Sequence, residues 1–125
     1  TFPEGSGLDM VFFVNSGSEA NDLALRLARA YTRGAQDVIV LGAAYHGHTA
    51  ALIEVSPYKY EGRGGFRQRP HVHKATAADT YRGAHTGEDA GPLYAQEVRY
   101  TAALNRVRAD GWPHLMLCVD AAVTR

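Results

Sequence analysis

Short apolar runs alternate with a helical pattern in the first part of the chain. Residues 10–14 and 37–41 carry almost only large apolar side chains and are bounded by turn residues. Such continuous runs are typical of strands that are buried on both faces of a sheet. Apolar residues between them recur at helical spacing, so the pattern predicts a strand, a helix and a second strand in this order.

The helix between the two runs has end signals and one apolar face. Ser16 and Glu19 have the spacing of a capping box at its start, and Gly34 is suited to end it. The residues expected to be buried recur three or four positions apart. They are Ala20, Leu23, Ala24, Leu27, Ala28 and Tyr31.

After the second run the sequence predicts another helix and a longer irregular stretch. The helix runs from about His48 to Val55 and is stopped by Pro57, because the residue before a proline avoids helical backbone angles. Regular structure thins out from residue 56 to residue 92. Within that stretch, only residues 71–74 have the character of a short strand.

The last part of the chain predicts a long helix and a final strand. Pro92 is a favourable first residue for a helix that runs to about Asp110, and residues 115–119 are expected to form the strand. The buried stripe of this helix is expected to be Leu93, Tyr100, Leu104 and Val107. Strands that alternate with helices indicate an α/β fold, with a mostly parallel sheet, flanking helices and right-handed crossovers.

Composition narrows the range of partners. The chain has 125 residues, 46% of them hydrophobic, which is enough for one domain with a buried core. The 13 acidic residues balance the 13 lysines and arginines, so nothing indicates nucleic acid or an anionic membrane surface as a partner. No apolar run approaches the roughly 18 residues that a membrane span needs. The first residues also lack the basic and apolar regions of a signal peptide.

The single cysteine, Cys118, excludes an intrachain disulfide and fits a reducing, cytoplasmic compartment. In its apolar strand it is expected to be a small core residue. The chain begins without a methionine and stops soon after the last expected strand. We therefore expect residues 1–125 to be an incomplete segment of one larger domain. A mitochondrial location stays open if a missing N-terminus carried a transit peptide.

A small polar turn opens the first expected helix and is a candidate phosphate site. Residues 15–22 read Asn-Ser-Gly-Ser-Glu-Ala-Asn-Asp. The first N–H groups of a helix have no partners within it, and the helix dipole favours an anion there. Gly17 allows a close backbone approach, and Ser16 and Ser18 add hydroxyl groups. The alternative is that Ser16 only caps the helix. The turn is neither a dinucleotide fingerprint nor a nucleotide triphosphate loop, because their glycine and lysine spacings are missing.

A second candidate follows the next strand, at residues 44–49. Tyr45 lies in the turn at the carboxyl edge of the sheet, where open α/β sheets bind ligands. Its ring is suited to cover a planar cofactor, and Gly47 is expected to leave room beside it. The alternative interpretation of Tyr45 is ordinary core packing.

Together the two motifs resemble the class III pyridoxal-phosphate-dependent aminotransferases, a branch of the fold-type I enzymes. The similarity to that family lies in the residue identities and the spacing of three parts: Asn-Ser-Gly-Ser-Glu-Ala-Asn, then a strand, then Tyr-His-Gly-His-Thr. Residues 56–59 and 79–83 are most similar to the subgroup of the alanine–glyoxylate type 2 aminotransferases and the related amino-phospho-lyases. The resemblance implies that residues 1–125 belong to the fold-type I large domain, which binds pyridoxal 5'-phosphate.

The resemblance also implies roles for individual residues. Gly17 and Ser18, with Ser16 beside them, would bind the cofactor phosphate. Tyr45 would stack on the pyridine ring of the cofactor, and His46 would hold that turn in place.

Two departures from the family pattern concern the end of the chain. Family members usually end the last strand with a glutamate near the cofactor. Here Asp120 occupies that place, and its shorter side chain would shift the contact or need a bridging water. The Schiff-base lysine of the family comes later than Arg125, and neither Lys59 nor Lys74 lies in a matching motif. We therefore assign no catalytic residue to this segment and expect no transamination by it alone.

The family resemblance implies an amino donor and a 2-oxo acid acceptor as substrates, and a homodimer in the full-length enzyme. The alternative is an amino-phospho-lyase, which expels phosphate from its substrate and needs the same cofactor-binding site. A non-catalytic copy that keeps the fold is a further alternative. The last is a zinc site formed by two alternating histidine pairs, at residues 46 and 48 and at residues 71 and 73. We expect no metal, since the aminotransferase motif already explains the first pair.

Overall fold

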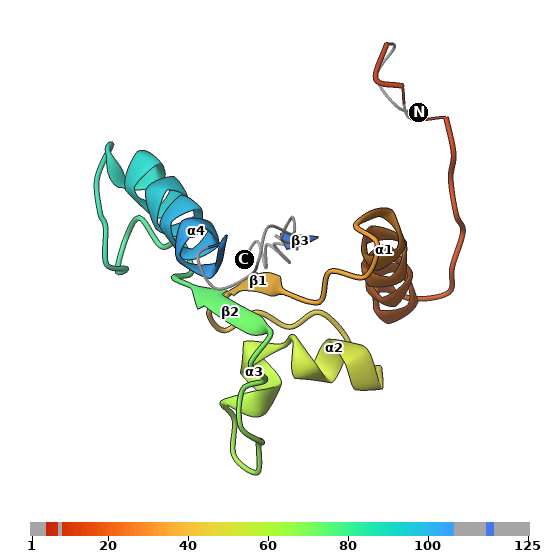
Figure 1. The fold of residues 1–125 in the computed structure, drawn as a ribbon. Coiled ribbons are helices and arrows are strands. Elements are labelled where there is room, and N and C mark those ends of the chain that lie inside the picture. Colours follow the sequence, from red (N-terminus) through yellow and green to blue (C-terminus); the bar gives the residue numbers. More distant parts are fainter. Residues whose placement is uncertain (1–4, 8, 107–114, 117–125) are drawn as a thin grey trace.

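A parallel sheet is at the centre of the structure. The computed structural model describes residues 5–7, 9–106 and 115–116. In this part of the chain, three parallel strands pair in the order β2-β1-β3 (Figure 1). They are β1 Val38–Leu41, β2 Val72–Ala75 and β3 Leu115–Met116. The parallel pairing confirms the predicted α/β class and the predicted strands at β1 and β2.

Helices flank these strands. α4 packs against β2 and β1, whereas α1 packs against α2. In Figure 1, α1 and α4 lie to the two sides of the strands. The described helices are α1 Gly17–Tyr31, α2 Ala50–Glu54, α3 Pro57–Tyr60 and α4 Ala90–Arg106. None of them is long and apolar enough to cross a membrane.

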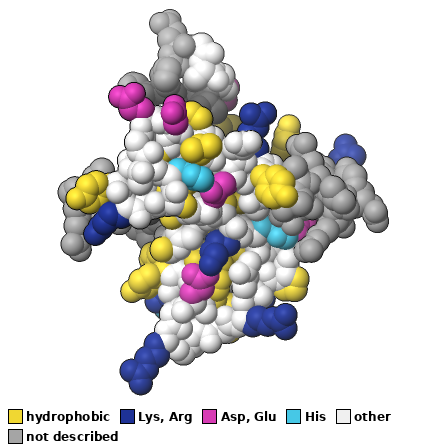
Figure 2. Space-filling view, turned by 90° about the vertical axis from the view of Figure 1, so that its left-hand side faces the viewer, with side chains coloured by type: hydrophobic (Ala, Val, Ile, Leu, Met, Phe, Trp, Pro, Cys, Tyr) yellow, Lys and Arg dark blue, Asp and Glu magenta, His cyan; other side chains and the backbone are white. Residues whose placement is uncertain are grey.

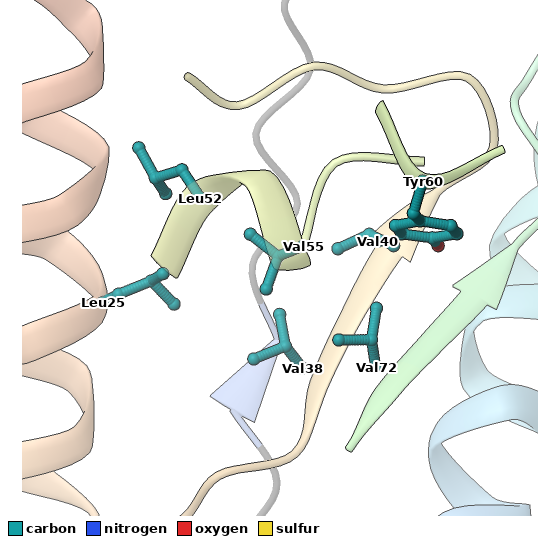
Figure 3. Close-up of a cluster of buried hydrophobic side chains, with 7 residues drawn as sticks. All are labelled: Leu25, Val38, Val40, Leu52, Val55, Tyr60 and Val72. Atoms are coloured by element: carbon teal, nitrogen blue, oxygen red, sulfur yellow. The ribbon is translucent and has the colours of Figure 1, made fainter. Parts of the chain in front are cut away.

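The core lies on one face of β1. Val38 and Val40 share that face, because alternate residues of a strand point the same way. They pack with side chains contributed by α1, by the α2–α3 region and by β2 (Figure 3). The cluster consists of Leu25, Val38, Val40, Leu52, Val55, Tyr60 and Val72. It holds α2 against the sheet and so positions the turn that leads from β1 into α2.

α1 starts where the capping box predicts. Ser16 is its N-cap, and Ser16 Oγ accepts a hydrogen bond from the Glu19 N–H at 3.1 Å. The Glu19 carboxylate reaches back and accepts a hydrogen bond from the Asn15 N–H at 2.7 Å. The helix ends at Tyr31, and Gly34 follows with a φ of +102°. Both predicted end signals are therefore confirmed.

The predicted buried stripe of α1 is wrong: Leu23, Ala24 and Ala28 are half-buried, Ala20, Leu27 and Tyr31 are exposed, and the buried residue is Leu25, which the pattern did not include. Leu27 is 48% exposed and Tyr31 is 91% exposed. α1 packs against α2, and Leu25 joins the core cluster together with Leu52. The helix is therefore turned so that part of its apolar face points away from its neighbour. Periodicity identifies an apolar face but not the element that covers it.

The predicted strand at residues 10–14 is also wrong. This segment has no regular secondary structure, and Phe13 is 95% exposed. β1 pairs with β2 on one edge and with β3 on the other, so neither edge of β1 is free. A strand needs a neighbour that satisfies its N–H and C=O groups, and an apolar sequence alone does not supply one.

The helices after β1 differ from the prediction in their limits. The expected helix from His48 to Val55 is the shorter α2, which starts after its N-cap Thr49. Pro57 stops that helix as predicted, but it also opens α3 as the first residue of a new turn. Proline is favoured at this position because the first helical N–H would be unpaired in any case.

α4 begins at Ala90, slightly before the predicted start at Pro92. Its predicted buried stripe is wrong at Leu93, which is 41% exposed, and at Tyr100, which is 65% exposed. Ala90 and Tyr94 are buried instead. The helix is therefore rotated relative to the orientation that its apolar spacing indicates.

Several expectations concern residues that the structure does not describe. They are the side chain of Leu104, Val107, residues 117–119 of the last strand with Cys118, and Asp120. β3 lies at the start of the expected last strand.

Candidate functional site

Two hydrogen bonds join the start of α1 to the turn that follows β1. The Asn21 side-chain amide donates to the carbonyl oxygen of His46 at 2.8 Å. The N–H of His48 donates to Ser18 Oγ at 3.1 Å. The two motifs that the sequence presents separately are therefore parts of one site beyond the carboxyl end of β1.

Gly47 allows this contact to be so close. Its φ of +140° lies in a range that other residues rarely adopt. A Cβ placed on Gly47 would be 2.7 Å from Ser18 Oγ and 2.7 Å from Leu52 Cδ1. The space that the missing side chain leaves is therefore used by α1 and α2, which corrects the expectation that it leaves room beside Tyr45.

The start of α1 combines unpaired donors with open space. Ser16 Oγ accepts from the Glu19 N–H, so the Ser16 side chain caps the helix, and its contact with a cofactor phosphate stays a prediction. Gly17 and Ser18 are the first two residues of the helix, where N–H groups have no acceptor within it. A Cβ added to Gly17 would meet no atom within 4 Å. An anion can therefore approach these N–H groups without displacing protein atoms.

Tyr45 presents its ring at the surface of the molecule. It is 43% exposed and is not a member of the core cluster, so the core-packing interpretation is wrong. The ring of Tyr58 lies edge-on to it, with the two centroids 6.1 Å apart. Lys59 Nζ lies 5.6 Å from the centre of the Tyr45 ring. An exposed ring that is supported at its edge is suited to stack on a flat ligand.

His46 is the buried part of the same turn. It is 2% exposed, and its N–H donates to Ser56 Oγ at 3.0 Å. The Ser56 hydroxyl in turn donates to the carbonyl oxygen of Leu52 at 2.6 Å. Neither ring nitrogen of His46 has a hydrogen-bond partner in the described part of the chain. Burial lowers the pKa of the imidazole below its usual 6.5, so the ring is neutral at pH 7.

The buried His46 predicts how the stability of the protein depends on pH. Because its pKa is lowered in the folded protein, the unfolded chain binds the proton more readily below about pH 6.5. We expect the stabilisation from the neutral ring to be complete above this pH and to be lost as the pH falls below it. Melting temperatures of the full-length protein between pH 7.5 and 5.5 measure this dependence. A His46→Gln variant should show a weaker dependence in this window, and an equal slope in both proteins would contradict the prediction.

Sequence reasoning missed two residues that organise the site. In the sequence, Asn21 is one residue of the polar motif, and Ser56 is one residue of the segment that resembles the subgroup. The Asn21 amide binds the carbonyl oxygen of His46 and the Ser56 hydroxyl accepts from its N–H, so the two residues hold the backbone on both sides of the His46 side chain. The only signal for Asn21 was its place in the polar motif, and Ser56 gave none, because its contact depends on how α2 folds back.

The zinc interpretation finds no ligand set in the residues that the structure describes. Among them, no group of three or more histidine, cysteine or acidic side chains is arranged to hold a metal ion. His46 is buried, and His73 Nε2 lies 2.7 Å from the carboxylate of Asp37. One histidine of each pair is therefore either buried, as His46 is, or already paired with a carboxylate, as His73 is.

Residues 79–83 form a tight turn that is tied to α4. The Asp79 carboxylate accepts hydrogen bonds from the N–H groups of Tyr81 and Arg82, both at 2.9 Å, and these bonds lower its pKa. The Tyr94 hydroxyl donates to the carbonyl oxygen of Asp79 at 3.0 Å. A Cβ on Gly83 would overlap this hydroxyl. Local packing thus gives residues 79–83, which resemble the subgroup of the alanine–glyoxylate type 2 aminotransferases and the related amino-phospho-lyases, a structural role.

A cleft of about 520 Å³ lies between the end of β2 and α4. On its wall, His85 Nε2 lies 2.6 Å from Glu97 Oε1. Hydrogen bonds from Thr76 and His85 lower the pKa of the Glu97 carboxyl. Figure 2 shows the side of the molecule on which α4 lies, where basic and acidic side chains are scattered rather than gathered in one patch. The residues that line the cleft belong to neither of the two joined motifs.

The fold and the joined motifs are typical of α/β domains that bind phosphate-containing ligands at one edge of a sheet. The family model described as Aminotransferase class-III matches residues 2–110. The chain therefore belongs to the class III aminotransferase family, which confirms the resemblance read from its motifs.

Curated relatives agree with this assignment. The chain is 53% identical over 109 residues to "Alanine--glyoxylate aminotransferase 2-like" of Drosophila melanogaster. This match covers 83% of this chain and 22% of the relative. The chain is also 48% identical over 104 residues to "Ethanolamine-phosphate phospho-lyase homolog 1" of Caenorhabditis elegans. This second match covers 74% of this chain and 22% of the relative. The chain thus spans about a fifth of the length of these relatives.

Solved structures of the same fold include both kinds of enzyme. An ω-aminotransferase from Paracoccus denitrificans matches with 27% identity and a TM-score of 0.62, over 82% of this chain and 25% of the other. A phospholyase from Arthrobacter in complex with phosphoethanolamine matches with 32% identity and a TM-score of 0.60, over 80% of this chain and 23% of the other. These matches confirm the expected fold-type I architecture.

Proposed function

We propose that the full-length protein is a pyridoxal-phosphate-dependent aminotransferase and that this chain holds part of its cofactor. The observation that carries the proposal is the direct contact between the start of α1 and the turn after β1. It brings unpaired helix N–H groups and an exposed tyrosine ring into one site. The first suits an anion and the second suits a flat ring, and pyridoxal 5'-phosphate contains both.

The described residues fit this cofactor. The N–H groups of Gly17 and Ser18 would bind its phosphate, which can reach them because no atom lies within 4 Å of a Cβ placed on Gly17. Ser18 Oγ already accepts from the His48 N–H, so its own hydroxyl proton is available to the phosphate. Tyr45 would lie over the pyridine ring. Asp120 is proposed to contact the cofactor in place of the usual family glutamate.

The chain's own residues hold the two parts of this site at a fixed separation. When bound, the cofactor supplies an electron sink at the substrate carbon that bears the amino group. Gly47 and Asn21 attach the turn to α1, so the ring support cannot move independently of the phosphate site. The buried, neutral His46 fills the inside of the turn. Such a preformed cradle orients the cofactor without further rearrangement.

The proposed reaction moves an amino group from an amino acid or amine to a 2-oxo acid. Family membership and the relative named as an aminotransferase 2-like protein support it. Amino-phospho-lyase chemistry is the second candidate. One relative at 48% identity and one solved structure at 32% identity carry that name, and this observation favours it. Both reactions use the same cradle, so the described residues do not choose between them.

One assay separates the two reactions. The full-length protein, loaded with pyridoxal 5'-phosphate, is given O-phosphoethanolamine and a 2-oxo acid, and both released phosphate and the new amino acid are measured. We expect amino transfer without phosphate release, and protein from which the cofactor has been dialysed is the control. Phosphate release alone would overturn the aminotransferase assignment in favour of the lyase. Failure to retain the cofactor at all would overturn both.

A further inference from the structure

Lys59 lies beside the proposed ring support. Its ammonium is 5.6 Å from the centre of the Tyr45 ring and 5.8 Å from the centre of the Tyr58 ring. The residue itself is half-buried, so its alkyl stem packs against the protein while its charged end faces the two rings. Because Tyr45 is half-exposed, this positive charge lies beside the ring that is proposed to support the cofactor.

The position of Lys59 is fixed by the backbone around it. The N–H of Tyr58 donates to the carbonyl oxygen of Ala44 at 3.1 Å, directly before Tyr45. Ser56 is buried and bonded to the N–H of His46. These contacts hold α3 against the turn after β1, so Lys59 and Tyr45 remain neighbours.

The Lys59 ammonium has no carboxylate within ion-pair distance among the described residues. Among the other cations of this region, Lys74 forms an ion pair with Glu61 and Arg69 forms one with Glu54 at 2.9 Å, whereas Arg63 and Arg67 are unpaired in the described part of the chain but are not placed against Tyr45. A cation over an exposed aromatic ring is held only weakly. Lys59 can therefore leave the rings for an anion that makes a charge-assisted hydrogen bond with it.

We propose that Lys59 is a specificity-determining residue that binds a phosphate monoester on the amino substrate. This inference rests on the proposed function. A substrate amino group reacts beside the cofactor ring, and an aminoethyl phosphate extends roughly 5 Å from that nitrogen, given covalent bonds of about 1.5 Å. The flexible four-carbon stem of lysine covers such a distance, and its compact charge suits a phosphate.

The test measures substrate affinity of the full-length, cofactor-loaded protein through the change in cofactor absorbance. Three amines are titrated: O-phosphoethanolamine, β-alanine with a carboxylate in place of the phosphate, and uncharged n-propylamine. In Lys59→Met we expect the affinity for O-phosphoethanolamine to fall about 10- to 100-fold, the range of one charge-assisted hydrogen bond. The affinity for n-propylamine should stay unchanged, and Lys59→Arg should restore part of the loss.

The matched control is Lys74→Met, which removes the other lysine of the chain and should leave all three affinities unchanged. Melting temperature and bound cofactor are compared to show that Lys59→Met is folded and loaded. An equal loss for all three amines, or no loss for O-phosphoethanolamine, overturns the role of Lys59 alone. A larger loss for β-alanine than for O-phosphoethanolamine overturns the choice of phosphate. Wild-type protein that retains no cofactor overturns the proposed function as well.

Discussion

Replacing Gly47 with alanine is expected to destabilise the protein by about 2–5 kcal/mol and to prevent stable cofactor binding. The new methyl group would be 2.7 Å from Ser18 Oγ and 2.9 Å from Ser18 Cα, and the second of these atoms belongs to the backbone of α1. Overpacking of this kind costs about 1–3 kcal/mol. The φ of +140° adds strain of a similar size for a residue with a side chain.

Thermal unfolding of the full-length protein measures the effect of Gly47→Ala. Gly91→Ala is the matched control, because a Cβ at Gly91 in α4 meets no atom within 4 Å. Alanine in a helix is favoured over glycine by about 0.5–1 kcal/mol, so this control should be neutral or slightly stabilising. A melting temperature of Gly47→Ala equal to that of the wild type would show that the turn does not close on α1 as described.

Replacing Gly17 with valine is expected to affect cofactor binding alone, with cofactor affinity lowered about 100-fold and little change in the stability of the cofactor-free protein. A Cβ added to Gly17 would meet no atom within 4 Å in the described structure, so the folded chain has open space at this position. The proposed phosphate would occupy the same space, and losing its hydrogen bonds to the helix start costs about 1.5–3 kcal/mol each. Titration of cofactor-free protein with pyridoxal 5'-phosphate, followed by absorbance, measures the affinity.

The two glycine variants separate folding from cofactor binding. Gly47→Ala should lower both, because the glycine is packed inside the contact between the motifs. Gly17→Val should lower only the affinity, because that glycine borders open space. Unchanged affinity in Gly17→Val, with the protein correctly folded, would place the phosphate elsewhere and contradict the proposed site.

Local sequence signals predicted the local elements well. The capping box at Ser16 and Glu19 marks the start of α1 as observed, because its hydrogen bonds lie within one turn of helix. The apolar run before Gly42 is the buried β1, with a parallel partner on each side. Pro57 ends α2 through its effect on the preceding residue.

The same signals failed where the partner of a segment decides its structure. Residues 10–14 are as apolar as β1, but β1 has both edges occupied and the segment stays exposed. The apolar spacing of α4 indicates Leu93 as buried, yet Tyr94 is the residue enclosed by Gly83 and Asp79. Hydrophobic periodicity describes one surface of an element and does not state which other surface meets it.

The sequence by itself determined the family, the α/β class and the two motifs that carry the proposed cofactor chemistry. These follow from residue types at short separations, where backbone geometry leaves few alternatives. Only the tertiary structure decided that Gly47 closes on Ser18, that His46 is enclosed, and that Lys59 lies over the ring of Tyr45. Such contacts join residues far apart in the chain, and packing of the whole domain, rather than any local preference, sets the distance between them.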